Sequence, residues 1–429
     1  MRARAVHPPN RPVDAAFRAV PSKSDTHRAL VAAALARGTS EIDSPLLADD
    51  TSRTRDGLAA LGARFAEYPS TWRVEGTAGS VRGGARIALG ESGTTCRLLA
   101  AVAAIGAEAS LLDGTPRLRE RPLRPLLEAL ASLGADVRAD PRTGGLPLRI
   151  GGRPMRGGAV RVPGGQSSQF ASALMLVGAR LHGGLEVEIE PPRVSLPYVR
   201  MTRRTLEAFG VRCSEAGEGT WRVPETDYPG GRYRVEGDHS SASYLLAAAV
   251  ATGGRVRLDG LEPDSLQADA AFGPLLRAAG ARVASAPGSV TVESSGTLAA
   301  FDVDLSASPD LAPTVAVVAL FADGECRLRG LGALRVKESD RLEAVAEGLH
   351  ALGAGVAVEG DALRVVPPAR PRGATVRTRS DHRLAMAFAV AGLRIPGVVV
   401  DDAACVAKSN PGFWDDFAAL EAGGIRTGS

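Results

Sequence analysis

The segment LLEALASLGADV, Leu126–Val137, contains the pattern that decides the fold. A helix-like run ends at a Leu-Gly-Ala signal and is followed by a β-like run, which is typical of a helix that stops at glycine and leads into a strand. Five other segments have the same form, namely GLAALGARF, TLEAFGVRC, LLRAAGARV, GLHALGAGVAV and AALEAGGI. The spacings are 72, 76, 70, 73 and 71 residues between Gly62, Gly134, Gly210, Gly280, Gly353 and Gly424. The sequence therefore predicts six copies of one α/β unit.

A second, Ala-rich helix recurs with the same period. Its copies read HRALVAAALARG, TCRLLAAVAAIG, SQFASALMLVGA, SASYLLAAAVATGG, PTVAVVALFADG and HRLAMAFAVAGL. Because these segments are apolar on nearly all faces, they should be buried inner helices, whereas the charged Leu-Gly-Ala segments should be amphipathic outer helices. Six such units could form one ring or two groups of three, and the residues themselves leave both arrangements open.

The residues that precede the inner helices are rich in Ser, Thr, Asp and Gly. They read PSKSDTHR, ESGTTCR, GGQSSQF, GDHSSAS, SPDLAPT and RSDHR. Such residues cap helix N-termini, whose unpaired N–H groups and positive dipole ends attract anions. If these N-termini face a common cleft, that cleft should bind multiply charged anions. The alternative, that the segments are only caps, is strongest for GDHSSAS and weakest where Lys or Arg is added, as in PSKSDTHR and SDHR.

Lysine is rare in this chain. Of the 51 Lys and Arg residues only Lys23, Lys337 and Lys408 are lysines, so the other 48 are arginines. An ammonium is a compact point charge and a guanidinium a planar fork, so a surface that needs only charge accepts either. One interpretation is that the three lysines were retained by chance. The other is that they are functional, and the surrounding segments PSKSDTHR, RVKESDRL and CVAKSNPGFW favour a function for all three.

Composition excludes several classes of protein. A net charge of +3 over 429 residues does not indicate a nucleic-acid or membrane-surface protein. The N-terminus has no signal-peptide pattern and no run is apolar enough to span a membrane, so we expect a cytoplasmic protein. The cysteines are too far apart for a zinc or disulfide framework, and no Walker A or dinucleotide motif is present. We therefore expect no metal and no cofactor.

Nine motifs, taken in order, resemble those of the EPSP synthase (3-phosphoshikimate 1-carboxyvinyltransferase) family. They are PSKSDTHRAL, ESGTTCRLL, PRLRERP, GGQSSQF, SLPYV, SPDLAP, LRVKESDRL, SDHRLAM and CVAKSNPGFW, and they cover about residues 18–416. The resemblance implies a two-domain inside-out α/β barrel built from six βαβαββ-type repeats, three per domain. It also implies that residues 20–236 form an N-terminal domain, and that 1–19 and 237–429 form a C-terminal domain, with the active site in the cleft between them.

The implied reaction transfers the enolpyruvyl group of phosphoenolpyruvate to the 5-hydroxyl of shikimate 3-phosphate and releases phosphate. The residues implied for shikimate 3-phosphate are Lys23, Ser24, Arg28, Ser167, Ser168, Gln169, Ser195, Tyr198, Asp310 and Lys337. Those implied for phosphoenolpyruvate are Lys23, Gly93, Thr94, Arg121, Gln169, Arg341, His382, Arg383 and Lys408. Both substrates are phosphorylated carboxylates, which agrees with the anion-binding cleft inferred from the helix caps. No nucleic acid, membrane or second subunit is implied, so we expect a monomer.

The chemistry requires a base for the attacking hydroxyl and an acid that protonates the methylene carbon of phosphoenolpyruvate. The resemblance implies that Asp310 is the proton acceptor and Glu338 the proton donor, with Lys408, Lys23 and His382 as further participants. Glu338 lies between Lys337 and Arg341 in sequence, so it needs burial or substrate charge to keep a proton near neutral pH.

Three residues depart from patterns seen in the family. Glu91 stands where many members have Asn, Ala333 where some use a polar side chain, and Leu98 where one branch has Pro. The response to glyphosate, which competes with phosphoenolpyruvate in sensitive members, is therefore left open.

Two other functions are alternatives to the reaction implied by the resemblance. The sister enolpyruvyl transferase that acts on UDP-N-acetylglucosamine should carry a reactive Cys or its Asp substitute in a mobile loop, and the corresponding LLDGTPRLRERP has no Cys. An RNA-end-binding protein of related repeat fold should present aromatic residues among basic ones, and only 4% of the residues are aromatic.

Overall fold

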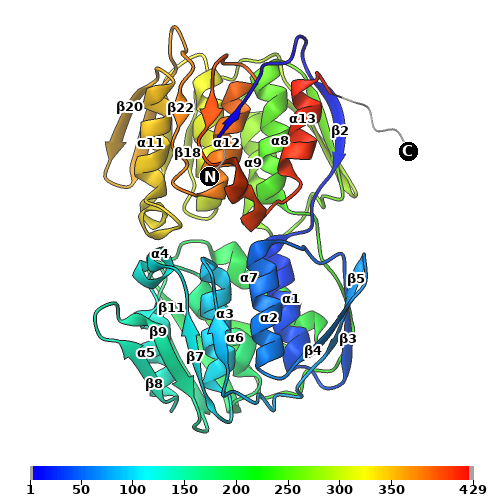
Figure 1. The fold of residues 1–429 in the computed structure, drawn as a ribbon, viewed down its shortest axis with the longest axis vertical. Coiled ribbons are helices and arrows are strands. Elements are labelled where there is room, and N and C mark those ends of the chain that lie inside the picture. The colour runs from blue at the N-terminus through cyan, green and yellow to red at the C-terminus, as the bar shows by residue number, and fades with distance from the viewer. Residues whose placement is uncertain (1–2, 425–429) are drawn as a thin grey trace. The chain divides into compact units, whose positions relative to one another are not determined.

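The structure is a computed structural model that describes residues 3–424. The chain divides into two compact units. Pro21–Glu236 is called the N-terminal unit, and Met1–Val20 together with Gly237–Ser429 is called the C-terminal unit. Figure 1 labels the elements of both units.

The N-terminal unit contains three repeats. The first consists of α1 (Lys23–Leu35), β3 (Thr39–Asp43), α2 (Asp49–Ala60), β4 (Arg64–Glu67) and β5 (Thr71–Glu75). The second consists of β6 (Arg86–Ala88), α3 (Gly93–Ala104), β7 (Ala109–Asp113), α4 (Pro116–Glu120), α5 (Arg124–Ser132), β8 (Val137–Asp140) and β9 (Gly145–Gly151). The third consists of β10 (Arg156–Pro163), α6 (Gln169–Gly178), β11 (His182–Glu190), α7 (Leu196–Ala208), β12 (Ser214–Gly217) and β13 (Thr220–Val223), and is followed by β14 (Arg232–Arg234).

The C-terminal unit also contains three repeats. The first consists of β2 (Asp14–Arg18), α8 (His239–Thr252), β15 (Arg255–Asp259), η1 (Ala268–Ala271), α9 (Phe272–Ala278), β16 (Arg282–Ala286) and β17 (Ser289–Glu293). The second consists of β18 (Asp302–Asp304), η2 (Pro309–Leu311), α10 (Ala312–Val318), η3 (Ala319–Phe321), β19 (Cys326–Arg329), η4 (Gly332–Val336), α11 (Arg341–Ala351), β20 (Gly355–Glu359) and β21 (Ala362–Val366). The third consists of β22 (Thr375–Val376), α12 (His382–Gly392), β23 (Val399–Val400), η5 (Ala403–Lys408), α13 (Phe413–Glu421) and β1 (Arg4–Ala5).

Each repeat contributes one small sheet, and five of the six sheets have the same topology. Their strand orders are β14-β3-β5-β4, β6-β7-β9-β8, β10-β11-β13-β12, β2-β15-β17-β16 and β18-β19-β21-β20. In each order the first pair is parallel and the other two pairs are antiparallel. The sixth sheet, β1-β23-β22, has one parallel and one antiparallel pair. The β-like run expected to begin at Ile425 lies outside the described residues.

Three pairings bring together strands that are distant in sequence, and one of them joins Arg4 in β1 to Val400 in β23. Tyr233 in β14 pairs with Ile42 in β3, so the end of the N-terminal unit completes its first sheet. Phe17 in β2 pairs with Leu258 in β15, so the start of the chain completes a sheet of the C-terminal unit.

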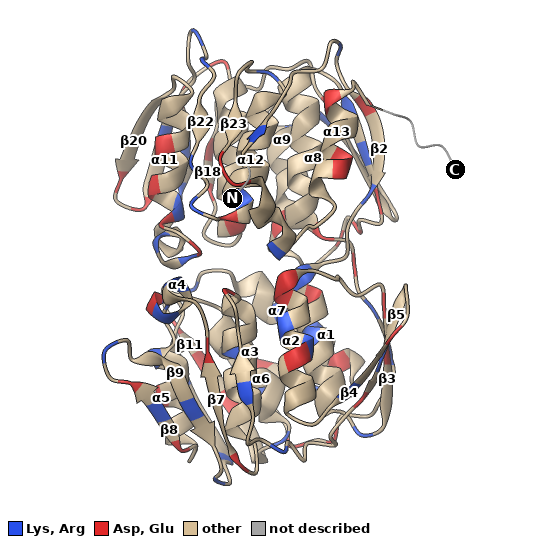
Figure 2. Cartoon of the chain, viewed as in Figure 1, with Lys and Arg blue, Asp and Glu red and all other residues tan. Residues whose placement is uncertain are grey.

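The inner and outer helices occupy the predicted layers. Every residue of α12 is buried, as are the residues of α1 from Asp25 to Leu35. In α5, by contrast, the buried residues form one stripe, Leu126, Leu127, Ala129 and Leu130. The sequences of α6 and α8 contain no Lys, Arg, Asp or Glu, so both helices are drawn tan in Figure 2. The structure thus confirms the six-repeat α/β fold, with three repeats in each unit and a separate apolar core in each.

The six repeat glycines follow the ends of the outer helices. Their φ angles, from 76° at Gly210 to 117° at Gly62, lie in the left-handed region that other residues rarely adopt. The Leu-Gly-Ala signal is therefore a helix C-terminal stop, as the sequence predicts. No helix among residues 3–424 has the length and apolar character needed to cross a membrane.

Candidate active site

The N-terminus of α1 holds the first predicted site residues. Ser22 caps this helix, since its Oγ accepts a hydrogen bond from the backbone N–H of Asp25 at 3.3 Å. Lys23 is therefore the first residue of the helix, where the dipole repels a cation. Its Nζ lies 3.1 Å from Oδ2 of Asp50, which is in α2, and this ion pair offsets the repulsion.

Arg28 lies one turn further along α1, and it is a buried cation with neutral partners. Its guanidinium donates to Oγ1 of Thr202 at 2.8 Å, to the carbonyl oxygen of Ser24 at 2.7 Å and to that of Tyr198 at 3.1 Å. It also lies 5.9 Å from the centre of the Tyr198 ring. Burial lowers the pKa of Arg28 to about 10, although Asp25 partly opposes this change. Within residues 3–424, no carboxylate forms an ion pair with Arg28.

Ser195 and Tyr198 are positioned by the start of α7. Ser195 precedes this helix with a φ of 59°, which is uncommon for a residue other than glycine. Strained backbone of this kind is found preferentially at functional sites. The backbone N–H of Tyr198 donates to the carbonyl oxygen of Ser195 at 3.1 Å, and the carbonyl oxygen of Tyr198 accepts from Arg28.

A second group of predicted residues lies where α3 and α6 begin. Nε2 of Gln169 donates to Oγ1 of Thr94 at 3.0 Å, and Oε1 of Gln169 accepts from Arg97 at 3.0 Å. Ser167 accepts a hydrogen bond from the backbone N–H of Gln169 at 3.2 Å, and Ser168 is buried just before α6. The structure therefore joins the ESGTT and GGQSSQF segments in one network.

Gly93 is the first residue of α3, and Arg121 lies directly over it. A Cβ atom at position 93 would lie 2.5 Å from the guanidinium carbon of Arg121. The absence of a side chain at position 93 thus makes room for the guanidinium of Arg121.

The C-terminal unit gathers three cations around one carboxylate. Asp310, in η2, lies 2.9 Å from Arg383, 3.1 Å from Arg341 and 3.3 Å from Lys337. Burial alone would raise the pKa of Asp310, but Arg383, Lys337 and Arg341 outweigh burial and hold this pKa well below its usual range. We call Asp310, Lys337, Glu338, Arg341 and Arg383 the Asp310 cluster.

Asp381 forms hydrogen bonds with the guanidinium of Arg341. Its Nε donates to Oδ2 of Asp381 at 2.9 Å and its NH2 donates to Oδ1 at 3.1 Å, a bidentate contact. NH2 also donates to Oε2 of Glu338 at 2.7 Å. Burial would lower the pKa of Arg341, but Asp381, Glu338 and Asp310 raise it, so the guanidinium stays charged.

The start of α12 and the end of η5 supply the remaining predicted residues. Arg379 and Ser380 both have positive φ angles, 53° and 57°, in the turn that leads to Asp381. Asp381 caps α12 by accepting a hydrogen bond from the backbone N–H of Arg383 at 3.0 Å. His382 is buried, and Lys408 is buried in η5, which packs against α12.

Four residues that contact predicted site residues were not predicted from the sequence, namely Asp50, Arg97, Thr202 and Asp381. Asp381 and Arg97 lie within quoted motifs, so their position beside assigned residues was an available signal. Asp50 and Thr202 lie in outer helices outside any motif, and only the structure shows that they contact Lys23 and Arg28.

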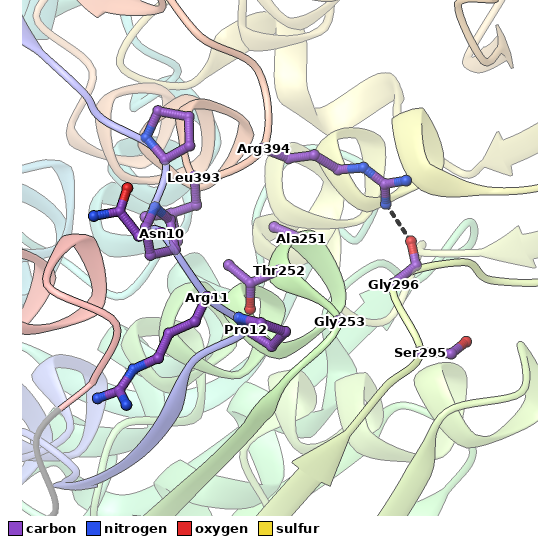
Figure 3. A pocket seen from close by; sticks show the side chains of 12 residues that line it. Asn10, Arg11, Pro12, Ala251, Thr252, Gly253, Ser295, Gly296, Leu393 and Arg394 are labelled. Carbon is purple, nitrogen blue, oxygen red and sulfur yellow. Dashed lines mark hydrogen bonds between the residues drawn. The ribbon is translucent and has the colours of Figure 1, made fainter.

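The C-terminal ends of α8 and α12 form a separate pocket, which Figure 3 shows. It has a volume of about 410 Å³, and Arg11, Thr252 and Arg394 are among its lining residues. Arg394 donates a hydrogen bond to the carbonyl oxygen of Gly296 in this pocket. Because none of the predicted site residues lines this pocket, and His382 and Arg383 lie at the opposite end of α12, the pocket is not part of the candidate active site. Among residues 3–424, no group of three or more His, Cys, Asp or Glu side chains is placed to hold a metal ion.

Comparisons with known proteins agree on one family. The family model of EPSP synthase (3-phosphoshikimate 1-carboxyvinyltransferase) matches residues 8–417. A 3-phosphoshikimate 1-carboxyvinyltransferase of Methanoculleus marisnigri is 43% identical over 407 residues, which cover 94% of this chain and 96% of the relative. The corresponding protein of Aeropyrum pernix is 45% identical, over 97% of this chain and 95% of the relative. A solved structure of EPSP synthase from Acinetobacter baumannii has a TM-score of 0.80 and 25% identity, with 98% of each chain covered.

Proposed function

Because this chain belongs to the EPSP synthase (3-phosphoshikimate 1-carboxyvinyltransferase) family, we propose that the residues gathered in its two units bind the substrates of that reaction and transfer its protons. The family uses two small-molecule substrates, phosphoenolpyruvate and shikimate 3-phosphate. The enolpyruvyl group of the first is transferred to the 5-hydroxyl of the second, and phosphate is released. The product, 5-enolpyruvylshikimate 3-phosphate, belongs to the shikimate pathway to chorismate and the aromatic amino acids.

The observation that carries the proposal is the state of Arg28. A buried guanidinium without a carboxylate partner has lost its hydration and gained only neutral hydrogen bonds, which is unfavourable. An anionic ligand would supply the missing charge, and a phosphate accepts two parallel N–H bonds from such a group. We assign Arg28, with Lys23, Ser24, Ser167, Ser168, Gln169, Ser195 and Tyr198, to shikimate 3-phosphate.

Binding of shikimate 3-phosphate tests this assignment. Titration calorimetry should give an affinity that is weaker by roughly 10- to 100-fold for Arg28→Lys, because an ammonium cannot reproduce the fork geometry. Arg37→Lys is the matched control, since Arg37 lies just beyond α1 and its side chain is 70% exposed. Equal affinity of wild type and Arg28→Lys would remove Arg28 from the site.

The Asp310 cluster is the proposed site of the anionic groups of phosphoenolpyruvate. Arg341 and Arg383 present guanidinium groups, and Lys408 and Arg121 are the further cations assigned to this substrate. Asp381 pre-orients Arg341 by its bidentate contact, so little rotamer freedom remains to be lost when the substrate binds.

The proposed base must lose its cations before it can act. A carboxylate held by three cations is a weak base, so Asp310 of the substrate-free protein would accept the hydroxyl proton poorly. Phosphoenolpyruvate competes for Arg341 and Arg383, and its negative charge raises the proton affinity of Asp310. Asp310 thereby becomes an effective base only when the second substrate is present.

The same competition acts on the proposed acid. The contact with Arg341 stabilises the ionised form of Glu338, and a substrate anion at Arg341 weakens that contact. Glu338 can then hold the proton that is delivered to the methylene carbon, and a tetrahedral intermediate forms. Loss of phosphate follows, and Lys408 is the second candidate for these proton transfers. We also propose that the protein acts as a cytoplasmic monomer.

A further inference from the structure

The carboxyl group of Asp269 is connected to the Asp310 cluster through one hydroxyl group. Asp269 lies in η1 and is 2% exposed. Oγ of Ser240, near the start of α8, donates a hydrogen bond to Oδ2 of Asp269. The same Oγ accepts from NH2 of Arg383 at 3.5 Å, and this nitrogen also donates to Oδ2 of Asp310 at 2.9 Å. Asp269, Ser240, Arg383 and Asp310 therefore form a continuous chain of hydrogen bonds.

The direction of the hydrogen bonds in this chain depends on the charge of Asp269. A guanidinium only donates and an ionised carboxylate only accepts, so the hydroxyl proton of Ser240 points to Asp269 and its lone pairs face Arg383. Donation to a charged carboxylate also makes Oγ a better acceptor. Protonation of Asp269 removes both effects, and the guanidinium of Arg383 is then held less firmly.

Asp269 is able to change its charge near neutral pH. Burial raises the pKa of Asp269 to about 7, with Arg383 lowering it and Asp310 raising it further. Asp269 also lines a pocket of about 160 Å³, which is large enough for water. The titratable and charged groups around Asp269 are Arg383 from α12, Asp310 from η2, Asp238 and His239 from the start of α8, and Arg277 from α9.

We infer that Asp269 and Ser240 are positioning residues that hold the guanidinium of Arg383 in the orientation that binds phosphoenolpyruvate. The inference rests on the proposed role of Arg383 in the family reaction. Ionised Asp269 favours binding, and protonated Asp269 weakens it. The carboxyl group does not touch the substrate in this account, so its removal should affect substrate affinity more than turnover.

The test is the KM for phosphoenolpyruvate at saturating shikimate 3-phosphate, measured from about pH 6 to about pH 8.5, on both sides of the Asp269 pKa of about 7. Asp269→Asn and Ser240→Ala should each raise this KM about tenfold at the alkaline end, with kcat within about threefold, as expected for one hydrogen bond to a charged group. The ratio of the Asp269→Asn KM to the wild-type KM should approach one at acidic pH. Protonation of the substrate itself affects all variants alike, so it cancels in this ratio.

Two comparisons separate positioning from a structural role. The double variant should be no worse than either single variant, because both substitutions break the same chain. Asp264→Asn is the matched control, since Asp264 is exposed in the loop before η1. If Asp269→Asn proves unstable in thermal unfolding, Ser240→Ala carries the same prediction.

Several results would overturn the inference. These are a KM ratio that does not change with pH, additive effects in the double variant, or a loss of kcat without a rise in KM. An inactive wild-type protein would instead contradict the proposed function, so the two failures are distinguishable.

Discussion

Arg341 and Glu338 form an ion pair in which NH2 of the arginine lies 2.7 Å from Oε2 of the glutamate. Their side chains are only 1% and 11% exposed, so solvent screens the pair weakly. In the substrate-free protein the proposed acid is therefore paired with a buried cation. The reaction requires this pair to loosen, and a substrate anion that competes for Arg341 provides the means.

Glu338→Gln should lower turnover without weakening the binding of phosphoenolpyruvate. Glutamine cannot donate the catalytic proton, so we expect kcat to fall by about 100-fold or more. Its neutral side chain also leaves Arg341 with more charge for the substrate, so KM should stay equal or fall. Glu343→Gln, which alters an exposed residue of α11 close after Glu338 in sequence, is the control. Near-normal kcat for Glu338→Gln would transfer the role of acid to another group, with Lys408 the first to examine.

Asp310→Asn should cost turnover far more than binding. We expect kcat to fall by about 100- to 10,000-fold, because the amide cannot accept the hydroxyl proton. Dissociation constants of both substrates, measured by calorimetry, should change much less. Asp361→Asn, at an exposed position in the same unit, should leave kcat unchanged. Substantial turnover by Asp310→Asn would remove the assignment of this residue as the base.

The same substitution should affect stability in a pH-dependent way. The native pKa of Asp310 lies below its unfolded value, so its charge stabilises the fold above the unfolded pKa of about 3.9 and this stabilisation is lost as pH falls toward the native pKa. At neutral pH, Asp310→Asn leaves three cations without their shared partner and should lower the melting temperature. This difference in melting temperature should shrink in acid, as measured by calorimetry with and without phosphoenolpyruvate. A constant difference across pH would contradict the cation cluster.

Lys23→Arg should fail although the charge is the same. The side chain of Lys23 is 12% exposed and its ammonium is paired with Asp50, and a planar guanidinium is larger and differently hydrated. We expect loss of most of kcat/KM, whereas Arg37→Lys, an exposed exchange of the same two residue types, should be neutral. Full activity of Lys23→Arg would mean that lysine survived there by chance.

Gly93→Ala should displace Arg121. The new methyl group would lie 2.5 Å from the guanidinium carbon, so Arg121 must move. We expect a higher KM for phosphoenolpyruvate with kcat reduced less, and Gly231→Ala, where a Cβ meets no atom within 4 Å, should change neither. An unchanged KM would mean that Arg121 does not bind this substrate.

The repeat was predictable from sequence because its stop signal is a backbone requirement. Gly62 and Gly210 adopt left-handed φ angles that other residues rarely tolerate, so the helix end leaves a visible mark in the sequence. The Ala-rich inner helices were equally visible, since burial on all faces removes polar residues. The pairings of β2 and β14 with distant strands have no such local mark. The family resemblance implied that the start of the chain belongs to the C-terminal domain, and the pairing of β14 with β3 was not predicted.

Candidate site residues could be named from the sequence where they lie in motifs, as Arg28 and Asp310 do, and their assigned roles stay predictions. The residues that hold them in place were not evident, since the ion pair of Lys23 with Asp50 joins residues 27 positions apart in different helices. No periodicity encodes such a contact. The low pKa of Asp310 likewise depends on three cations that tertiary folding brings together, and composition gives no sign of it.

Phosphate release from phosphoenolpyruvate, measured with purified protein in the presence of a chelator, is the decisive test of the proposed reaction. Shikimate 3-phosphate and UDP-N-acetylglucosamine are offered as acceptors in parallel. The proposed reaction requires release with shikimate 3-phosphate alone, at a rate that Asp310→Asn nearly abolishes. Release with the UDP-sugar alone, or with neither acceptor, would contradict it.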